Sequence, residues 1–352
     1  MCLNPTTSSR ALSSAVEFAE ALRRTYPGNC RSESSDAMLV ARAVDADKLL
    51  YYIAIVQPPI QPHLTRTAEP PGELIVSERA EVDTVAVSIC DNIAWVKFNR
   101  PEKRNCMSPK LNRQMLRVLT ELEFRKDVGV LVLTGEGNAW SAGMDLKEYF
   151  RDSEAQGLKG IRQSQREAYA WWERLRWYQK VTIAMVNGWC FGGGYGPLFA
   201  CDLAYCSDEA QFGLSEVNWG ILPGGGATKV ASELMPMRKA MYHALLGETL
   251  TGKQAELAGL VNESVPAALL EAHVGDVAAR LLKKNWEALK ATKDAVRRVR
   301  EMTYDNAEDY LIRAQEALSF HDKSDGRLVG MRQFLDEKTY RPGLGEYDKQ
   351  RG

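Results

Sequence analysis

The chain has 352 residues, of which 45% are hydrophobic and 26% charged, and its formal net charge is −1. This is the composition of an ordinary globular protein, long enough for one large domain or two. With no long basic run, nucleic-acid binding has no electrostatic support. No apolar run approaches the ~18–20 residues that a membrane-spanning helix needs.

Cysteine and histidine are too scattered to indicate a metal site. The seven cysteines form no CxxC pair, and none of the four histidines lies three or four residues from another. We therefore expect no metal ion. An odd number of cysteines without an apolar signal segment indicates reduced thiols, so we expect a cytoplasmic protein.

Residues 1–82 differ in composition from the rest of the chain. Serines surround one modest helical pattern, and two proline-rich tracts follow at 57–62 and 69–72. Prolines stop helices and favour extended chain. We interpret 1–82 as a poorly ordered or appended N-terminal extension. An upstream start codon and a targeting peptide are the alternatives, although the acidic residues argue against the latter.

The folded region is expected to begin near Asp83 with a hairpin, because apolar residues alternate at 84–89 and 93–98 around an Asp-Asn turn. Ser108 before Pro109 predicts a helix start. The apolar face of that helix consists of Leu111, Met115, Val118, Leu119 and Leu122. The continuous apolar run 128–135 predicts a central strand covered on both faces.

Alternating elements continue along the chain. A long helix is expected at about 158–179, and strands at 181–186 and 204–206. The apolar side of the expected helix at 158–179 consists of Ile161, Ala168, Trp171, Trp172, Leu175 and Tyr178. Further helices are expected at 238–246, 252–258, 266–284, 285–300 and 304–320. Strands that alternate with helices before a helical tail predict an α/β fold of stacked ββα units.

The stretch 181–226 carries the candidate chemistry. A buried strand, the glycine triplet 192–194 and a helix start leave backbone N–H groups free to bind an anion. Glu216, further along, offers acid/base chemistry. A triplet alone would indicate only a flexible turn, and a lone glutamate a surface ion pair. A second turn at Gly143 and Met144 favours the functional interpretation.

Several blocks resemble the crotonase (enoyl-CoA hydratase/isomerase) superfamily, and within it the p-hydroxycinnamoyl-CoA hydratase/lyase (feruloyl-CoA hydratase-lyase, vanillin-forming) family. The superfamily blocks are 99–105, 141–146, 188–194, 212–220 and 258–261, and the segments most similar to the hydratase/lyases are 142–150, 184–194, 213–220 and 306–311. The resemblance covers about 83–350. It implies a ClpP/crotonase-like spiral of ββα units over 83–270 and a C-terminal helical trimerisation region over 271–352.

This resemblance implies a coenzyme A thioester as substrate, with its carbonyl oxygen held between the backbone N–H groups of Met144 and Gly193. Removing one such donor typically costs about 10²–10³ in rate. The residues expected along CoA are Lys103, Ala142, Gly143, Met144, Asp145, Leu146, Lys147, Gly193, Gly194 and Tyr195. A solvated surface charge is the alternative for each lysine. No separate cofactor is implied.

Glu216 matches the second of the two glutamates of enoyl-CoA hydratases, while the first falls on Gly196, where hydratase/lyases typically carry serine. One carboxylate can serve successive steps if it changes protonation state between them. Glu216 would activate water for attack on the β-carbon, return a proton to the α-carbon and deprotonate the new hydroxyl. Cleavage of the Cα–Cβ bond would release an aromatic aldehyde such as vanillin, together with acetyl-CoA, from feruloyl-CoA or p-coumaroyl-CoA.

The resemblance also places Tyr149 and Trp219 around the aromatic ring of the substrate, with Ser215 and Gly196 lining the same pocket. Core packing is the alternative for Trp219 and Tyr195. A further family tyrosine, two residues after Tyr310, is Ile312 here, so the partner of the para-hydroxyl stays open.

Two other functions stay open at this point: an enoyl-CoA hydratase or isomerase acting on another acyl-CoA, and a non-catalytic acyl-CoA-binding protein. The resemblance implies a homotrimer or a dimer of trimers, with the C-terminal helices packing across subunits. Residues 1–80 lie outside the resemblance, so their deletion is expected to leave activity intact.

Overall fold

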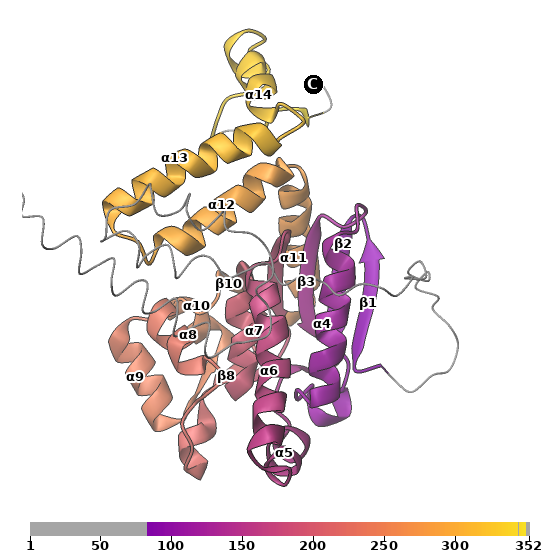
Figure 1. The fold of residues 1–352 in the computed structure, drawn as a ribbon, viewed down its shortest axis with the longest axis vertical. Helices are drawn as coiled ribbons and strands as arrows, with labels where there is room; N and C mark the ends of the chain where they lie inside the picture. The colour runs from indigo at the N-terminus through magenta and orange to yellow at the C-terminus, as the bar shows by residue number, and fades with distance from the viewer. Residues whose placement is uncertain (1–82, 344, 350–352) are drawn as a thin grey trace, which may run out of the picture. The chain divides into compact units, whose positions relative to one another are not determined.

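A computed structural model of the chain describes residues 83–343 and 345–349, which form two sheets and the helices that cover them (Figure 1). The expectations for residues 1–82 lie outside the described residues. The six-stranded main sheet has the order β1-β2-β3-β5-β7-β10. Its strands are β1 (Val85–Cys90), β2 (Ile93–Phe98), β3 (Val130–Gly135), β5 (Val181–Val186), β7 (Leu203–Ser207) and β10 (Glu263–Val265).

The main sheet confirms the predicted hairpin and the predicted central strand. Strands β1 and β2 pair antiparallel, and the remaining neighbours pair parallel. Every residue of β3 and of β5 is buried, as a continuous apolar run predicts for strands covered on both faces.

A second sheet of four short strands was not predicted from the sequence. Its order is β4 (Ala139–Ser141), β6 (Trp189–Phe191), β8 (Gln211–Gly213) and β9 (Thr249–Thr251). Strands of three residues are too short to show a period-two pattern. Strands β4, β6 and β8 each follow a strand of the main sheet along the chain, which gives the repeated ββα unit.

The helices of the first part of the fold cover the sheets. They are α4 (Pro109–Glu123), α5 (Asp152–Glu154), α6 (Gly157–Arg176), α7 (Tyr195–Ala200), α8 (Ala227–Leu234), α9 (Met237–Leu246) and α10 (Gly252–Leu257). Four single-turn segments lie between them: η1 (Pro101–Lys103), the π-turn η2 (Leu146–Arg151), η3 (Gly192–Gly194) and η4 (Ser215–Trp219). The Ser108 hydroxyl accepts the Leu111 N–H at 3.2 Å, which confirms the predicted helix start.

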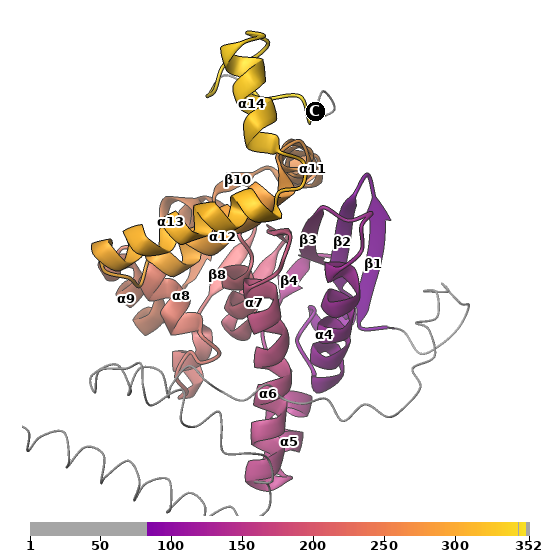
Figure 2. The same cartoon turned by 45° about the horizontal axis from the view of Figure 1, so that its top comes forward.

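The C-terminal part consists of α11 (Ala267–Leu282), α12 (Trp286–Val299), α13 (Tyr304–His321) and α14 (Gly326–Leu335), seen best in Figure 2. Helix α11 packs on the main sheet through Leu270, Val274 and Ala278. Helix α13 packs on α12 but has no buried residue of its own. No helix in the described ranges is long and apolar enough to cross a bilayer.

Candidate active site

The turn between β4 and η2 holds the Met144 backbone in a fixed orientation. Gly143 has φ +91°, a conformation that side chains rarely adopt. The Met107 N–H donates to the Gly143 carbonyl at 2.8 Å, and the Asp145 N–H donates to the Met107 carbonyl at 3.0 Å. The Met144 N–H lies between these two bonds and has no acceptor of its own among the described residues.

A buried ion pair anchors the far side of this turn. Asp145 accepts the N–H groups of Lys147 and Glu148 at the start of η2, and its other oxygen lies 3.1 Å from the Arg100 guanidinium. Burial alone would raise the pKa of Asp145. Hydrogen bonds from the Glu148 N–H and the Cys106 thiol, with the charge of Arg100, instead lower that pKa. The carboxylate therefore stays charged and fixes the start of η2 next to Met144.

The glycine triplet forms η3 and directly faces the Met144 turn. A Cβ at Gly193 would lie 2.8 Å from Met144 Sδ and 3.4 Å from Met144 N, and a Cβ at Gly143 would lie 3.2 Å from Gly193 N. These short distances place the Met144 and Gly193 N–H groups side by side. Gly193 is the second residue of η3, where an N–H has no intrahelical acceptor. Two backbone N–H groups so close together are able to stabilise a developing oxyanion.

Glu216 lies beside the same glycine turn. Its side chain, on η4, is buried, and Oε2 has no hydrogen-bond partner. Gly192 has φ +47°, and a Cβ there would lie 2.5 Å from Glu216 Oε1. Burial raises the pKa of Glu216 because the charged form loses its hydration. A buried carboxyl of raised pKa beside this glycine turn can transfer protons at a carbon next to a carbonyl.

The residues expected around the aromatic ring of the substrate lie on different elements of the fold. Tyr149 is half-buried on η2, and burial raises its pKa to about 12, with a smaller contribution from the Tyr169 hydroxyl. Trp219 is 51% exposed at the end of η4, and Ser215, the first residue of η4, is half-buried. Ile312 lies on α13 and is 55% exposed.

The other predicted site residues are placed as follows. Tyr195 is fully buried, and its hydroxyl lies 2.8 Å from His243 Nε2, so only its main chain can face a ligand. Lys103 and Lys147 are exposed. Lys103 forms ion pairs with Asp145 and Glu148, and Lys147 forms one with Asp152. In the rest of the set, Ala142 is half-buried, Leu146 exposed and Gly194 buried.

Two neighbouring residues were not singled out from the sequence. Trp172 of α6 lies against Gly196, and His243 of α9 lies against Tyr195. Periodicity had assigned Trp172 only to the apolar side of its helix, which is correct but does not reveal what the indole contacts. No local signal could have found either pair, because each joins residues far apart in the chain.

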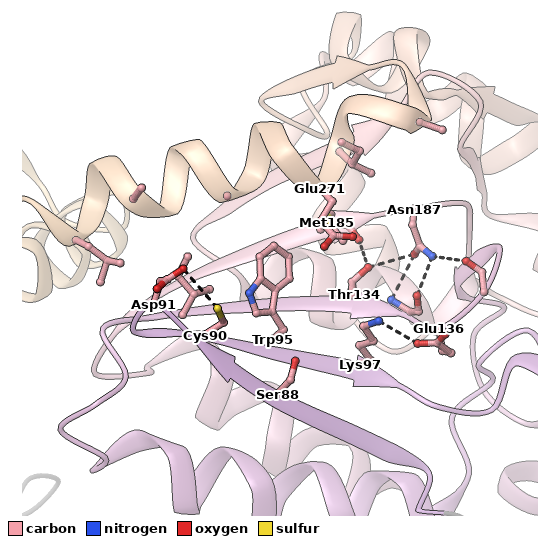
Figure 3. Close-up of a pocket in the computed structure, with 18 residues that line it drawn as sticks. Ser88, Cys90, Asp91, Trp95, Lys97, Thr134, Glu136, Met185, Asn187 and Glu271 are labelled. Atoms are coloured by element: carbon pink, nitrogen blue, oxygen red, sulfur yellow. Dashed lines mark hydrogen bonds and ion pairs between the residues drawn. The ribbon is translucent and has the colours of Figure 1, made fainter.

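A cavity of about 830 Å³ lies elsewhere, between the main sheet and α11. Figure 3 shows the Trp95 ring standing between the strands and that helix. The polar groups that line the cavity bind one another. Lys97 pairs with Glu136 at 3.1 Å, and the Asn187 amide donates to the Gly135 and Gly137 carbonyls. The lining of this cavity includes none of Met144, Gly193 and Glu216.

Comparisons with known proteins agree with this geometry. The family model for enoyl-CoA hydratase/isomerase matches residues 88–341. A hydroxycinnamoyl-CoA hydratase-lyase of Pseudomonas fluorescens is 52% identical over 268 residues, which cover 76% of this chain and 97% of that protein. A 4-chlorobenzoyl coenzyme A dehalogenase of an Arthrobacter species is 34% identical over 56% of this chain and 71% of its own length.

Solved structures give the same answer for the fold. The crystal structure of an enoyl-CoA hydratase from Bacillus anthracis superposes with a TM-score of 0.66 at 25% identity, covering 72% of this chain and 96% of that one. The α/β fold expected from the sequence, a crotonase spiral with C-terminal helices, is thereby confirmed. The chain belongs to the enoyl-CoA hydratase/isomerase family.

Proposed function

We propose that this chain is a hydroxycinnamoyl-CoA hydratase-lyase. Water adds to the double bond of a hydroxycinnamoyl-CoA, and the Cα–Cβ bond then breaks to give an aromatic aldehyde and acetyl-CoA. The observation that carries the proposal is the buried carboxyl of Glu216 beside the glycine turn, with glycine and no second carboxyl at position 196. Identity of 52% to a hydratase-lyase along nearly the whole of that relative supports it.

The backbone of two turns stabilises the negative charge that forms in each step. The thioester oxygen accepts the N–H groups of Met144 and Gly193, which the structure holds side by side. Charge moves onto this oxygen when water attacks the β-carbon, and again when the Cα–Cβ bond breaks and leaves the enolate of acetyl-CoA. Fixed donors aimed at a developing oxyanion lower both barriers.

Glu216 moves the protons in this scheme. As a carboxylate it takes a proton from the attacking water, and as an acid it returns that proton to the α-carbon. It then takes the proton of the β-hydroxyl while the Cα–Cβ electron pair moves into the thioester, and it finally protonates the enolate. A pKa raised by burial brings the two protonation states closer to equal population at neutral pH.

The aromatic ring of the substrate is placed against Tyr149 and Trp219, near Ser215 and Gly196. The Tyr149 hydroxyl is the polar group that we assign to the para-oxygen, because burial keeps it protonated and able to donate. The CoA chain follows 142–147 and 193–195, and the exposed Lys103 and Lys147 meet its phosphates.

The assembly that we propose is a homotrimer or a dimer of trimers, joined by the C-terminal region 271–352. Helix α13 exposes the apolar side chains Tyr304, Leu311, Ile312 and Phe320, which a second subunit would cover in part. Sedimentation of the purified chain tests this, and a monomer would contradict it. The five described cysteines are free thiols, which fits the cytoplasm that we propose as its location.

Incubation of the purified chain with feruloyl-CoA tests the function. Equal amounts of vanillin and acetyl-CoA are expected. Accumulation of the β-hydroxyacyl-CoA without aldehyde would instead identify a hydratase. Binding without turnover, unchanged in Glu216→Gln, would identify a non-catalytic acyl-CoA-binding protein.

A further inference from the structure

The indole of Trp172 lies against Gly196 and Gly225, close to the glycine turn. Trp172 lies on α6 and is 7% exposed. A Cβ at Gly196 would lie 2.9 Å from its Cδ2 and Cε3 atoms. A Cβ at Gly225 would lie 3.3 Å from its Cη2 and 3.9 Å from the Cα of Gly193. The ring therefore fills the gap between α7 and the turn before α8, on the side of the site where residue 196 points.

This ring has little freedom to move. It makes edge contacts with Trp171, at a centroid distance of 6.0 Å, and with Tyr169, at 5.3 Å. The atoms that approach Gly196 belong to the fused edge of the indole and not to the end of a flexible chain. Close-packed interiors respond to such overlap with strain of about 1–3 kcal/mol. Trp172 and Gly196 thus form a matched pair in which the ring requires glycine.

Two further observations connect Trp172 with the acyl pocket. Its Nε1 is buried and has no hydrogen-bond partner, although a buried tryptophan N–H usually finds one. Tyr169 contacts the Trp172 ring on one side, and its hydroxyl acts on the pKa of Tyr149. Trp172 therefore lies between Gly196 and Tyr169, on the side of the site from which Tyr169 influences Tyr149.

We propose that Trp172 is a specificity-determining residue of this site, which takes the volume that a side chain at position 196 would need. Exclusion of a second carboxyl leaves Glu216 as the only proton-transfer group at the reacting carbons. Two carboxyls would hold the attacking water and favour simple hydration, whereas one carboxyl is free to deprotonate the β-hydroxyl. This inference rests on the proposed hydratase-lyase function and names the residue that directs its outcome.

A double-mutant cycle tests the pairing of the two residues. Gly196→Ala, Trp172→Leu and their combination are compared by thermal unfolding and by aldehyde formation from feruloyl-CoA. Gly196→Ala is expected to reduce turnover about tenfold or more, the equivalent of about 1.4 kcal/mol, and Trp172→Leu is expected to restore most of that loss. Trp171→Leu is the matched control, because Trp171 is also buried on α6 but is not among the atoms nearest to a Cβ at Gly196. Equal rescue by Trp171→Leu, or no loss in Gly196→Ala, would overturn the proposal.

The chemical consequence is tested by Gly196→Glu combined with Trp172→Leu. This variant is expected to release mainly β-hydroxyacyl-CoA, and its pH–rate profile is expected to gain a second ionisation. A product ratio equal to that of the unchanged chain would overturn the proposal, and the alanine cycle decides the question if this variant does not fold. Absence of aldehyde from the unchanged chain would defeat the proposed function itself, whereas aldehyde formation without coupling between 172 and 196 would defeat only this inference.

Discussion

Two carboxyl groups with little exposure to solvent, those of Asp202 and Glu216, lie in opposite surroundings. Asp202, after α7, has Lys293 Nζ at 2.7 Å, Arg297 at 3.0 Å and the Thr182 N–H at 2.9 Å. Glu216 is buried to a similar degree but keeps one oxygen without any partner. The first region holds α12 against the core of the protein, and the second contains the proposed oxyanion hole.

The contrast shows how burial serves structure in one place and chemistry in the other. A buried charge with two cations and backbone donors is compensated, so Asp202 can tie a helix to a strand. A buried carboxyl with one unpaired oxygen and no cation beside it is costly in its charged form, which raises its pKa and prepares it for proton transfer. Changes at the two carboxyls should therefore separate stability from activity.

The largest effect is expected for Glu216→Gln. Loss of the proton-transfer group should reduce turnover by about 10²–10⁴-fold. Stability at neutral pH should not fall, because the amide removes a buried charge. Aldehyde release and thermal unfolding are the measurements, and Glu209→Gln, an exposed change nearby in the chain, is the control. If Glu216→Gln instead lowers the unfolding temperature and keeps its turnover, Glu216 has a structural role and not a catalytic one.

Asp202→Asn should produce the opposite result. Removing one member of a buried ion cluster typically costs about 3–5 kcal/mol of unfolding free energy, because the remaining charges lose their partner. Urea unfolding measures the loss, and turnover per folded molecule should stay near that of the unchanged chain. Asp127→Asn, in an exposed pair with Arg125, should leave stability unchanged. Equal losses in the two variants would remove the distinction between the regions.

Gly193→Ala should reduce turnover by about 10²–10³-fold. Its Cβ would lie 2.8 Å from Met144 Sδ and would push the two donor turns apart. Gly224→Ala is the matched control, because the nearest atom to its Cβ would be 3.8 Å away. Single-turnover rates with feruloyl-CoA separate this effect from binding. A loss confined to the KM would mean that Gly193 contacts the substrate but does not stabilise the oxyanion.

The smallest effect concerns pH. Burial raises the folded-state pKa of Glu216 above the ordinary glutamate value of 4.5. The acid limb of kcat/KM should therefore lie above pH 4.5. Burial disfavours the charged form in the folded state, so the contribution of this group to stability is fully present below pH 4.5 and is lost as pH rises through the raised pKa. The unfolding temperature of Glu216→Gln should exceed that of the unchanged chain at neutral pH, and this gap should close in acid. An acid limb at or below pH 4.5 would contradict the assignment.

The sequence predicted much of this fold because local periodicity is strong in it. The apolar faces of α4 and α6, the β1–β2 hairpin and the buried runs of β3 and β5 are confirmed. Strands β4, β6, β8 and β9 were missed, since strands of three residues carry no period of their own.

The sequence by itself determined the class of fold, the glycine turn and the choice of Glu216, because each rests on residue type and spacing along the chain. Tertiary structure alone decided how those parts meet. It placed Met144 against Gly193, turned the Tyr195 hydroxyl to His243 and set the Trp172 indole on Gly196. These contacts join residues of different helices and turns, so their energy depends on packing geometry that no local pattern encodes.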